Sequence, residues 1–133
     1  MSITANKRLV RRFFKSVWNE RDFGQIDALF ADNPLLADAT RRTVHGVIVA
    51  IPDLHVTIEE LIAEGDRVVA RWTARGTLRG DLPGLGPTGP LRLTGVYIFR
   101  LAGGTIAGLY PLMDRQGLAE QIRSVAGPRL RRN

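Results

Sequence analysis

The sequence predicts an α+β domain in which N-terminal helices pack on one face of a curved antiparallel sheet. Apolar residues recur at helical spacing near the N-terminus, and β-rich segments separated by turn signals follow after Ile51. The helices precede the strands instead of alternating with them. This order favours an antiparallel sheet over parallel βαβ units.

The chain length of 133 residues predicts one domain, spanning residues 1–133, with a flexible C-terminal tail from about residue 127. Its composition, 44% hydrophobic and 24% charged, is typical of a globular protein. The chain has no cysteine and only two histidines, His45 and His55, neither of which we place in the functional site. We therefore predict chemistry without a metal or a cofactor.

The first predicted helix covers residues 9–18. Its apolar stripe consists of Leu9, Val10, Phe13, Phe14, Val17 and Trp18. The arginines and lysines of this segment take the opposite face, toward water. The stripe itself is expected to face the core.

A second, short helix is predicted to begin at Asp22, whose carboxylate caps the first turn while Gln25 reaches back to it. The side chains that this helix presents to the core are Phe23, Ile26, Leu29 and Phe30. Asn33-Pro34 either ends the helix or restarts the chain as a cap and a first turn.

Four consecutive strands follow, at residues 55–65, 66–80, 91–104 and 105–114. Between the second and the third lies DLPGLGPTGP, residues 81–90, which we expect to form an ordered loop because prolines and glycines pair poorly in a ladder. Helical spacing returns at the end of the chain, over residues 117–125.

Alternation along residues 66–77 predicts that one face of the second strand is interior. The apolar positions are Val68, Ala70, Trp72 and Ala74, and the opposite face carries Arg67, Arg71 and Arg75. The same period places Tyr110, Leu112 and Asp114 on one face of the last strand. Asp114 ends an apolar run, so it needs either a structural or a chemical explanation.

The net charge of +6 comes largely from one face of the first helix and from the tail PRLRRN. We expect a solvated surface and no nucleic-acid partner, because no base-stacking motif accompanies the charge. Charges throughout the first 20 residues argue against a signal peptide, and no apolar run approaches the ~20 residues of a membrane span. A cytoplasmic location without membrane contact is expected.

Three stretches carry a family resemblance: IPDLHVTIEELIAEGDRVVARWTARGTLRGDLPGLGPTG, VYIFRLAGGTIAGLY and MDRQGLAEQI. From about Pro52 to Ile122 the chain resembles the SnoaL-like polyketide cyclases, within the nuclear-transport-factor-two-like superfamily. The resemblance implies a cone-shaped α+β fold with a deep apolar pocket. It also implies cofactor-free aldol ring closure of aromatic polyketides, with Asp114 in the place of the family's general acid/base.

The chain departs from the family's pattern at two places. Leu109-Tyr110 stands where relatives usually have His-Trp, so a polar pocket group is missing or replaced. The segment between Pro34 and Pro52 is short, and we expect it to lack a helix that would cover the mouth of the cone. An uncovered apolar pocket predicts a homo-oligomer.

The predicted site combines the family's aspartate with nearby groups. The predicted catalytic residues are Asp114, Tyr110 and Arg100, and the predicted substrate-binding residues are Trp72, Tyr97, Leu112 and Phe14. Alternatively, Asp114 only caps the helix that follows it, Arg100 is an exposed strand-end residue, and the aromatic residues belong to the core.

The predicted function is ring closure of a planar or polycyclic ketone, a small-molecule substrate from which Asp114 removes the acidic proton. Two alternative enzyme functions begin with the same carbanion. One is a cofactor-independent hydroxylase, in which the carbanion reacts with dioxygen, and the other is a spiro- or ether-forming cyclase. A third alternative is a polyketide-binding protein without catalysis. Fold alone does not choose among them.

Overall fold

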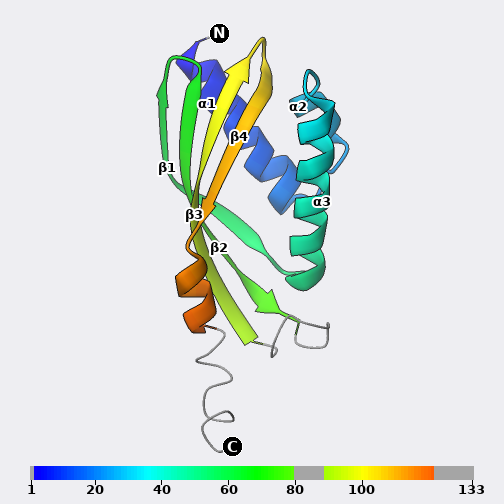
Figure 1. Cartoon of the computed structure of the whole chain (residues 1–133), viewed down its shortest axis with the longest axis vertical. Coiled ribbons are helices and arrows are strands. Elements are labelled where there is room, and N and C mark those ends of the chain that lie inside the picture. The colour runs from blue at the N-terminus through cyan, green and yellow to red at the C-terminus, as the bar shows by residue number, and fades with distance from the viewer. Residues whose placement is uncertain (1, 80–88, 122–133) are drawn as a thin grey trace, which may run out of the picture.

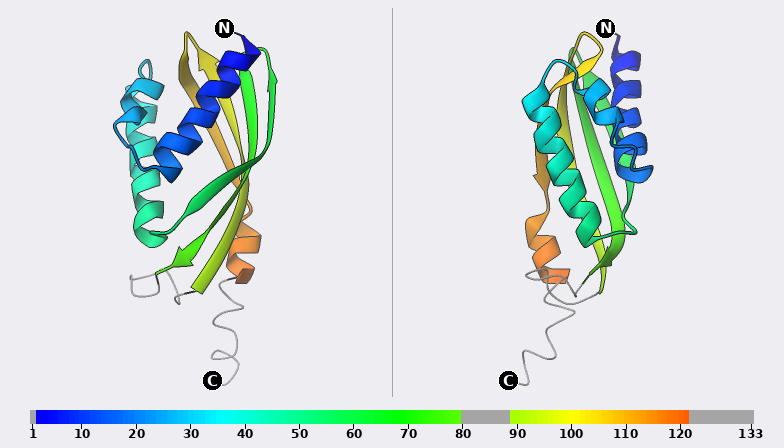
Figure 2. Two further views of the ribbon diagram at one scale, coloured as in Figure 1. Left: turned by 180° about the vertical axis from the view of Figure 1, so that it is seen from behind. Right: turned by 90° about the vertical axis from the view of Figure 1, so that its right-hand side faces the viewer.

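The computed structural model describes residues 2–79 and 89–121. Helices come first, and a four-stranded antiparallel sheet follows (Figure 1). The sheet is curved and does not close, and α1 and α3 lie over the same face of it (Figure 2). This arrangement confirms the predicted α+β class. Most of the predicted loop at 81–90 and the tail from about residue 127 lie outside the described residues.

The first predicted helix has two parts, α1 (Ile3–Arg12) and the π-helical η1 (Phe13–Asn19). Ser2 caps α1, its hydroxyl accepting from the N–H of Ala5 at 3.0 Å. The end of η1 is tied to the sheet by Asn19, whose side-chain amide donates to Val56 O and accepts from Val56 N. The rings of Phe13 and Phe14 pack on Tyr97 and Phe99 of the sheet.

The second helix, α2 (Gln25–Leu29), begins three residues later than predicted, with Gly24 at its N-cap. Asp22 does not cap the first turn, but its carboxylate accepts a long hydrogen bond from the Gln25 side chain at 3.4 Å. The predicted core side chains Ile26, Leu29 and Phe30 are fully buried.

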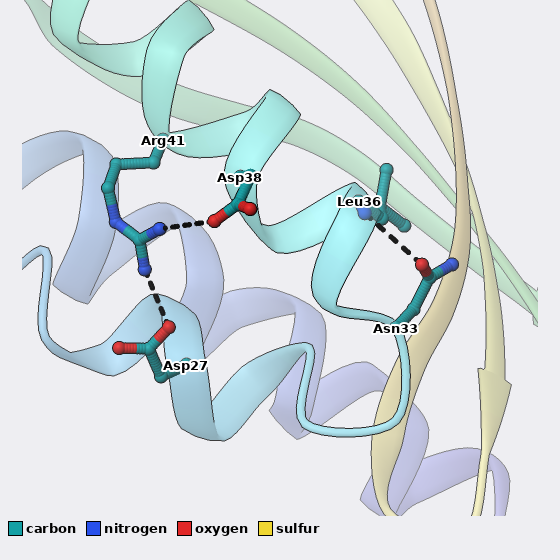
Figure 3. Close-up of polar contacts among 5 residues, drawn as sticks. All are labelled: Asp27, Asn33, Leu36, Asp38 and Arg41. Atoms are coloured by element: carbon teal, nitrogen blue, oxygen red, sulfur yellow. Dashed lines mark hydrogen bonds and ion pairs between the residues drawn. The ribbon is translucent and has the colours of Figure 1, made fainter.

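A long helix, α3 (Pro34–Ala50), occupies the segment that we expected to lack one, so that expectation was wrong. Asn33 caps it, accepting from the N–H of Leu36 at 3.1 Å, and Pro34 follows in the first turn (Figure 3). Of the two roles left open for Asn33-Pro34, the restart of the chain is the one observed.

An ion-pair network fixes α3 to α2. Arg41 reaches Asp27 at 2.6 Å and Asp38 at 2.9 Å (Figure 3). The β-branched residues and Gly46 in the second half of this segment lower its intrinsic helix propensity and obscured the helical pattern. Capping at one end and burial of Ala37 and Val44 stabilise the helix nonetheless.

The four strands lie close to their predicted positions: β1 (His55–Glu64), β2 (Arg67–Leu78), β3 (Gly89–Ala102) and β4 (Thr105–Met113). Neighbours in the chain are neighbours in the sheet, in the order β1-β2-β3-β4. Gly65, Gly103 and Gly104 have positive φ in the connecting turns, where a side chain would be strained.

The helix-covered face of the sheet is the interior face predicted for the second strand. Val68, Ala70, Trp72 and Ala74 of β2 are all at most 7% exposed. They pair with Phe99, Tyr97, Gly95 and Leu93 of β3. The opposite, convex face carries the exposed Arg67, Arg71 and Arg75.

The chain turns helical again over residues 115–121, beyond the end of β4 (orange in Figure 1). The Gln121 side chain accepts from Arg92 N at 2.7 Å and donates to Arg92 O at 2.6 Å. This fork attaches the helical segment to β3 and positions the junction at Asp114 beside the sheet. The rest of the helix predicted at 117–125 lies outside the described residues.

Candidate functional site

A cavity of about 440 Å³ lies between the sheet, η1 and α3. Four aromatic side chains form much of its wall, namely Phe14, Trp18, Trp72 and Tyr97. Aliphatic side chains complete the wall, among them Val47 of α3, Val56 of β1 and Leu93 of β3. The size and the apolar lining are typical of a small-molecule site.

Polar groups are few in this cavity. Thr43 of α3 and Arg115 at the start of the helical segment 115–121 line it, and both are exposed residues that mark its opening to solvent. No carboxylate lines the cavity in the described part of the chain. The entrance therefore carries positive charge, which favours ligands with an anionic or electron-rich oxygen.

Tyr97 stands at the centre of the aromatic wall. Its ring stacks on Phe14, with centroids 5.7 Å apart and an interplanar angle of 30°, and lies 5.8 Å from the Trp72 ring. Burial raises the pKa of the Tyr97 phenol to about 12. At neutral pH this hydroxyl is a hydrogen-bond donor and not a base.

The two tryptophans of the wall come from different elements, Trp18 from η1 and Trp72 from β2. The ring of Trp72 rests on Gly95 of β3, where a Cβ would lie 2.4 Å from its Cζ2 atom. Any side chain at this position of β3 would therefore displace the ring. Glycine is required there by the close approach of the indole.

Asp114 lies at the junction between β4 and the helical segment 115–121, and it is exposed. Its Oδ1 accepts from Gly117 N at 2.9 Å, and its main-chain N–H donates to Thr94 O at 2.9 Å. The side chain therefore caps the helix, as one of the two interpretations of the sequence expected. It is not a cavity-lining residue, although its neighbours Met113 and Arg115 are.

Tyr110 and Leu112 share the convex face of β4, and Asp114 lies just beyond the end of that strand. Tyr110 pairs with Ile98, and Leu112 with Val96, on the side of the sheet away from the helices. Tyr110 is 62% exposed and does not line the cavity, whereas Leu112, 50% exposed, borders it at the free edge of β4. Alternation correctly grouped these residues, but it did not reveal which face is interior.

Arg100 also lies on the convex face, paired with Arg67 on one side and Gly108 on the other. It is exposed and does not line the cavity. The structure thus does not bring Arg100 or Tyr110 together with the cavity. In contrast, it brings together Trp72, Tyr97, Leu112 and Phe14, whose role in substrate binding stays a prediction.

Sequence reasoning missed most of the residues that line the cavity, among them Trp18, Thr43, Val47 and Arg115. Thr43 and Val47 were missed because the segment that carries them was not predicted to be helical. Arg115 was missed although it directly follows Asp114, at the junction of a strand and a helix. That junction is the signal that identifies it, because its neighbour Asp114 was already a predicted site residue.

Within residues 2–79 and 89–121, no three or more histidine, aspartate or glutamate side chains are grouped so that they could hold a metal ion. In the same part of the chain, no helix is long and apolar enough to cross a membrane.

Several solved protein structures have a fold similar to that of this chain. A putative polyketide cyclase from Acidithiobacillus ferrooxidans is 25% identical, with a TM-score of 0.78 over 93% of this chain and 99% of that protein. TsrD from Streptomyces laurentii is also 25% identical, with a TM-score of 0.75 over 92% of this chain and 97% of its own.

A third similar structure, AclR from Streptomyces galilaeus, is described as a putative hydroxylase. It is 20% identical, with a TM-score of 0.75 over 91% of this chain and 86% of its own, a likeness that shows the fold alone. A comparison with curated proteins found no match.

The sequence itself matches a family profile across most of its length. The profile describes the SnoaL-like polyketide cyclases and matches residues 8–122, from α1 through the helical segment that follows β4. The match thus includes every element that lines the cavity. The chain belongs to the SnoaL-like polyketide cyclase family.

Proposed function

We propose that the chain is a cofactor-free polyketide cyclase that closes a ring by an intramolecular aldol reaction. The observation that carries the proposal is the cavity of about 440 Å³, with its aromatic wall and a cationic opening at Arg115. Such a cavity takes up a planar polyketone and folds its reacting ends together. Ideal orientation supplies up to ~7–11 kcal/mol of the barrier, so one base and a shaped cavity suffice.

We assign the general acid/base to Asp114. Its neighbours Met113 and Arg115 both line the cavity, and its carboxylate is exposed, with Gly117 N as its hydrogen-bond donor. Rotation of this side chain away from the cap turns it toward a bound substrate. Contacts of this kind often form only in the substrate complex, so the cap does not argue against the assignment.

The proposed reaction conserves the atoms of the substrate. Asp114 removes the proton from a carbon between two carbonyls, and the carbanion forms a bond to a carbonyl carbon within the same molecule. The resulting alkoxide takes up a proton, for which protonated Asp114 is the donor. The product is therefore an isomer of the substrate.

In the proposed reaction Arg115 and Tyr97 replace Arg100 and Tyr110, which the sequence predicted to be catalytic. Both line the cavity, whereas the other two lie on the convex face. Arg115 balances the charge of the enolate at the opening, and the Tyr97 hydroxyl donates to a developing oxyanion inside. A donor that stays protonated is suited to this work, and the raised pKa of Tyr97 keeps it so.

A second candidate function is binding of a polyketide without catalysis. The hydrogen bond from Gly117 N to Asp114 favours it, because that contact by itself explains why an aspartate follows the last strand. In this case the cavity shields or carries its ligand, and Asp114 has a structural role only.

We also propose that two copies associate through the convex face of the sheet. An apolar row crosses all four strands there, formed by Ile62, Val69, Ile98 and Tyr110. Ile62 in this row is 58% exposed. Contiguous exposed apolar side chains on a protein surface usually mark a contact with another molecule. Two-fold pairing buries the same patch on both copies. Because α3 covers the cavity, an uncovered pocket no longer argues for an oligomer. The exposed apolar row on the convex face is the reason to expect one.

The reaction is tested with a polycyclic β-keto ester, with and without dioxygen, and the product is identified by mass spectrometry and NMR. We expect a cyclised isomer of unchanged mass in both atmospheres. Product that contains an added oxygen and forms only in air identifies a hydroxylase. Tight binding without conversion of any of a series of polyketones supports the binding protein and contradicts the cyclase.

A further inference from the structure

The two tryptophans differ from the rest of the cavity wall because each carries a polar atom that the protein leaves unpaired. Trp18 and Trp72 are 6% and 7% exposed. Neither indole Nε1–H finds an acceptor among the residues that the structure describes. Buried donors are nearly always hydrogen-bonded in native proteins, so two unpaired ones in a single cavity wall need an explanation.

The Trp72 ring lies against Gly95 of β3, close to the main chain of β4. A Cβ on Gly95 would lie 2.8 Å from Trp72 Cε2, the atom bonded to Nε1, and 2.4 Å from the main-chain O of Leu112. The indole therefore lies over β3, and the neighbouring strand β4 contributes Pro111 and Met113 to the same cavity wall.

The polar side chains that line the cavity with the indoles can all donate hydrogen bonds. Tyr97 lies beside Trp72 with its phenol protonated, and Arg115 brings a cation to the opening. Within the described residues, the lining contributes no carboxylate. A ligand that matches this wall must supply acceptor atoms of its own.

We propose that Trp18 and Trp72 are specificity-determining residues whose indole N–H groups donate hydrogen bonds to oxygen atoms of the bound ligand. The proposal rests on the proposed function in that it refers to the same cavity. We expect the cavity to bind a planar compound with carbonyl oxygens at its edge more tightly than a hydrocarbon of the same outline. Because χ2 of an aromatic side chain is broad, a modest turn of each ring presents its N–H to the ligand.

Wild-type protein tests this inference directly, because the chain has only two tryptophans and therefore two indole N–H signals. The probes are anthraquinone-2-sulfonate and anthracene-2-sulfonate, which share their outline and their charge and differ in the two carbonyl oxygens. In ¹H–¹⁵N spectra, we expect the quinone to move both indole protons downfield and the hydrocarbon to leave them without that shift.

Calorimetry gives the corresponding affinities. One hydrogen bond is worth about 5- to 10-fold in affinity, so Trp72→Phe and Trp18→Phe are each expected to weaken quinone binding by about that factor. Binding of the hydrocarbon is expected to change little. Phe30→Leu is the matched control, because Phe30 is fully buried but lies outside the cavity wall, and it should weaken neither probe.

Equal affinity for the two probes with no downfield shift of the indole signals overturns the inference, and so does failure of the quinone to bind. These outcomes are separate from those of the turnover assay. Quinone preference in a protein that converts no polyketone contradicts the proposed reaction alone. Turnover that is unaffected in both tryptophan variants, together with unshifted indole signals, contradicts the role of the tryptophans alone.

Discussion

Replacing Gly95 by alanine is expected to destabilise the protein and to disturb the cavity. The new methyl group would lie 2.4 Å from Trp72 Cζ2 and 2.4 Å from the main-chain O of Leu112. Both distances are far below van der Waals contact. Because one neighbour is backbone of the adjacent strand, rotation of the indole alone does not relieve the clash.

The size of the effect follows from two opposing terms. Overpacking of this kind costs about 1–3 kcal/mol, and loss of a glycine from the unfolded chain returns ~0.4–1 kcal/mol. The free energy of unfolding should therefore fall by about 1–2 kcal/mol. With an unfolding entropy of roughly 2.1 cal/mol/K per residue, this lowers the melting temperature of a domain of 133 residues by about 4–7 °C.

The assay is thermal unfolding followed by circular dichroism, with tryptophan emission recorded on the same samples. Gly46→Ala is the control, because a Cβ there meets nothing within 4 Å in the middle of α3. That change should raise the free energy of unfolding by up to ~1 kcal/mol through helix propensity. The reasoning is refuted if Gly95→Ala melts at the wild-type temperature with unchanged emission.

Three further predictions follow from single contacts. Burial raises the pKa of Tyr97 to about 12, so the stability that its protonated phenol contributes is complete below pH 10 and is lost as the pH rises through 12. Urea titrations at several pH values should show this loss in the wild type and not in Tyr97→Phe, and that variant should also turn over about 10²-fold more slowly. Hydrogen bonds from the Thr77 N–H and hydroxyl lower the pKa of Asp53 in the folded protein. The stability that they add is present above pH 3.8 and is lost as the pH falls through the pKa of the folded state, and Asp53→Asn should remove this pH dependence from acid unfolding titrations. Ile62→Lys should turn a dimer into a monomer in light scattering, whereas the equally radical Val49→Lys on α3 should not; a monomeric wild-type protein contradicts the proposed interface.

The strands could be predicted almost completely from the sequence. Their alternation and turn signals are local, and Gly65 and Gly103 adopt the positive φ that glycine tolerates best. The interior face of β2 could be identified because arginines take its other side. In β4 no such contrast exists, since Tyr110 and Leu112 are apolar and yet lie on the convex face. Only pairing with β3 decides which side of that strand is interior.

The long helix α3 was the main failure of prediction. Thr40, Thr43 and Val44 are β-branched residues that disfavour a helix intrinsically, and the resemblance to relatives implied that the segment was too short. Its stability comes from tertiary contacts that no local pattern contains, above all the burial of Ala37 and Val44. The cavity residues of α3 were lost with it.

The candidate site was predicted where it depends on aromatic residues of regular elements. Phe14 and Trp72 lie on the interior faces that periodicity assigns to them, and Tyr97, chosen as an aromatic residue of a strand, also lies in the cavity wall. Arg100 was misplaced because the choice relied on a shared sheet, and a sheet has two faces. Each of the two interpretations of Asp114 has a structural feature in its favour. The hydrogen bond from Gly117 N supports a helix cap, and the cavity-lining neighbours Met113 and Arg115 support a catalytic role.

The role of Asp114 is the central claim, and Asp114→Asn tests it most directly. Asparagine and aspartate cap helices about equally well, so the contact with Gly117 N and the melting temperature should persist. Asparagine takes up no proton, so a general acid/base should lose its rate by roughly 10²–10⁴-fold. Gly117→Ala adds a second perturbation, because its Cβ would lie 2.3 Å from Asp114 Oδ2 and displace the carboxylate.

The decisive measurement is turnover of a polycyclic β-keto ester by wild-type and Asp114→Asn protein, with binding and melting determined on the same samples. The account predicts unchanged binding, near-normal melting and a rate lowered by roughly 10²–10⁴-fold in the variant. Wild-type turnover by a folded Asp114→Asn protein would contradict it and leave Asp114 as a helix cap only.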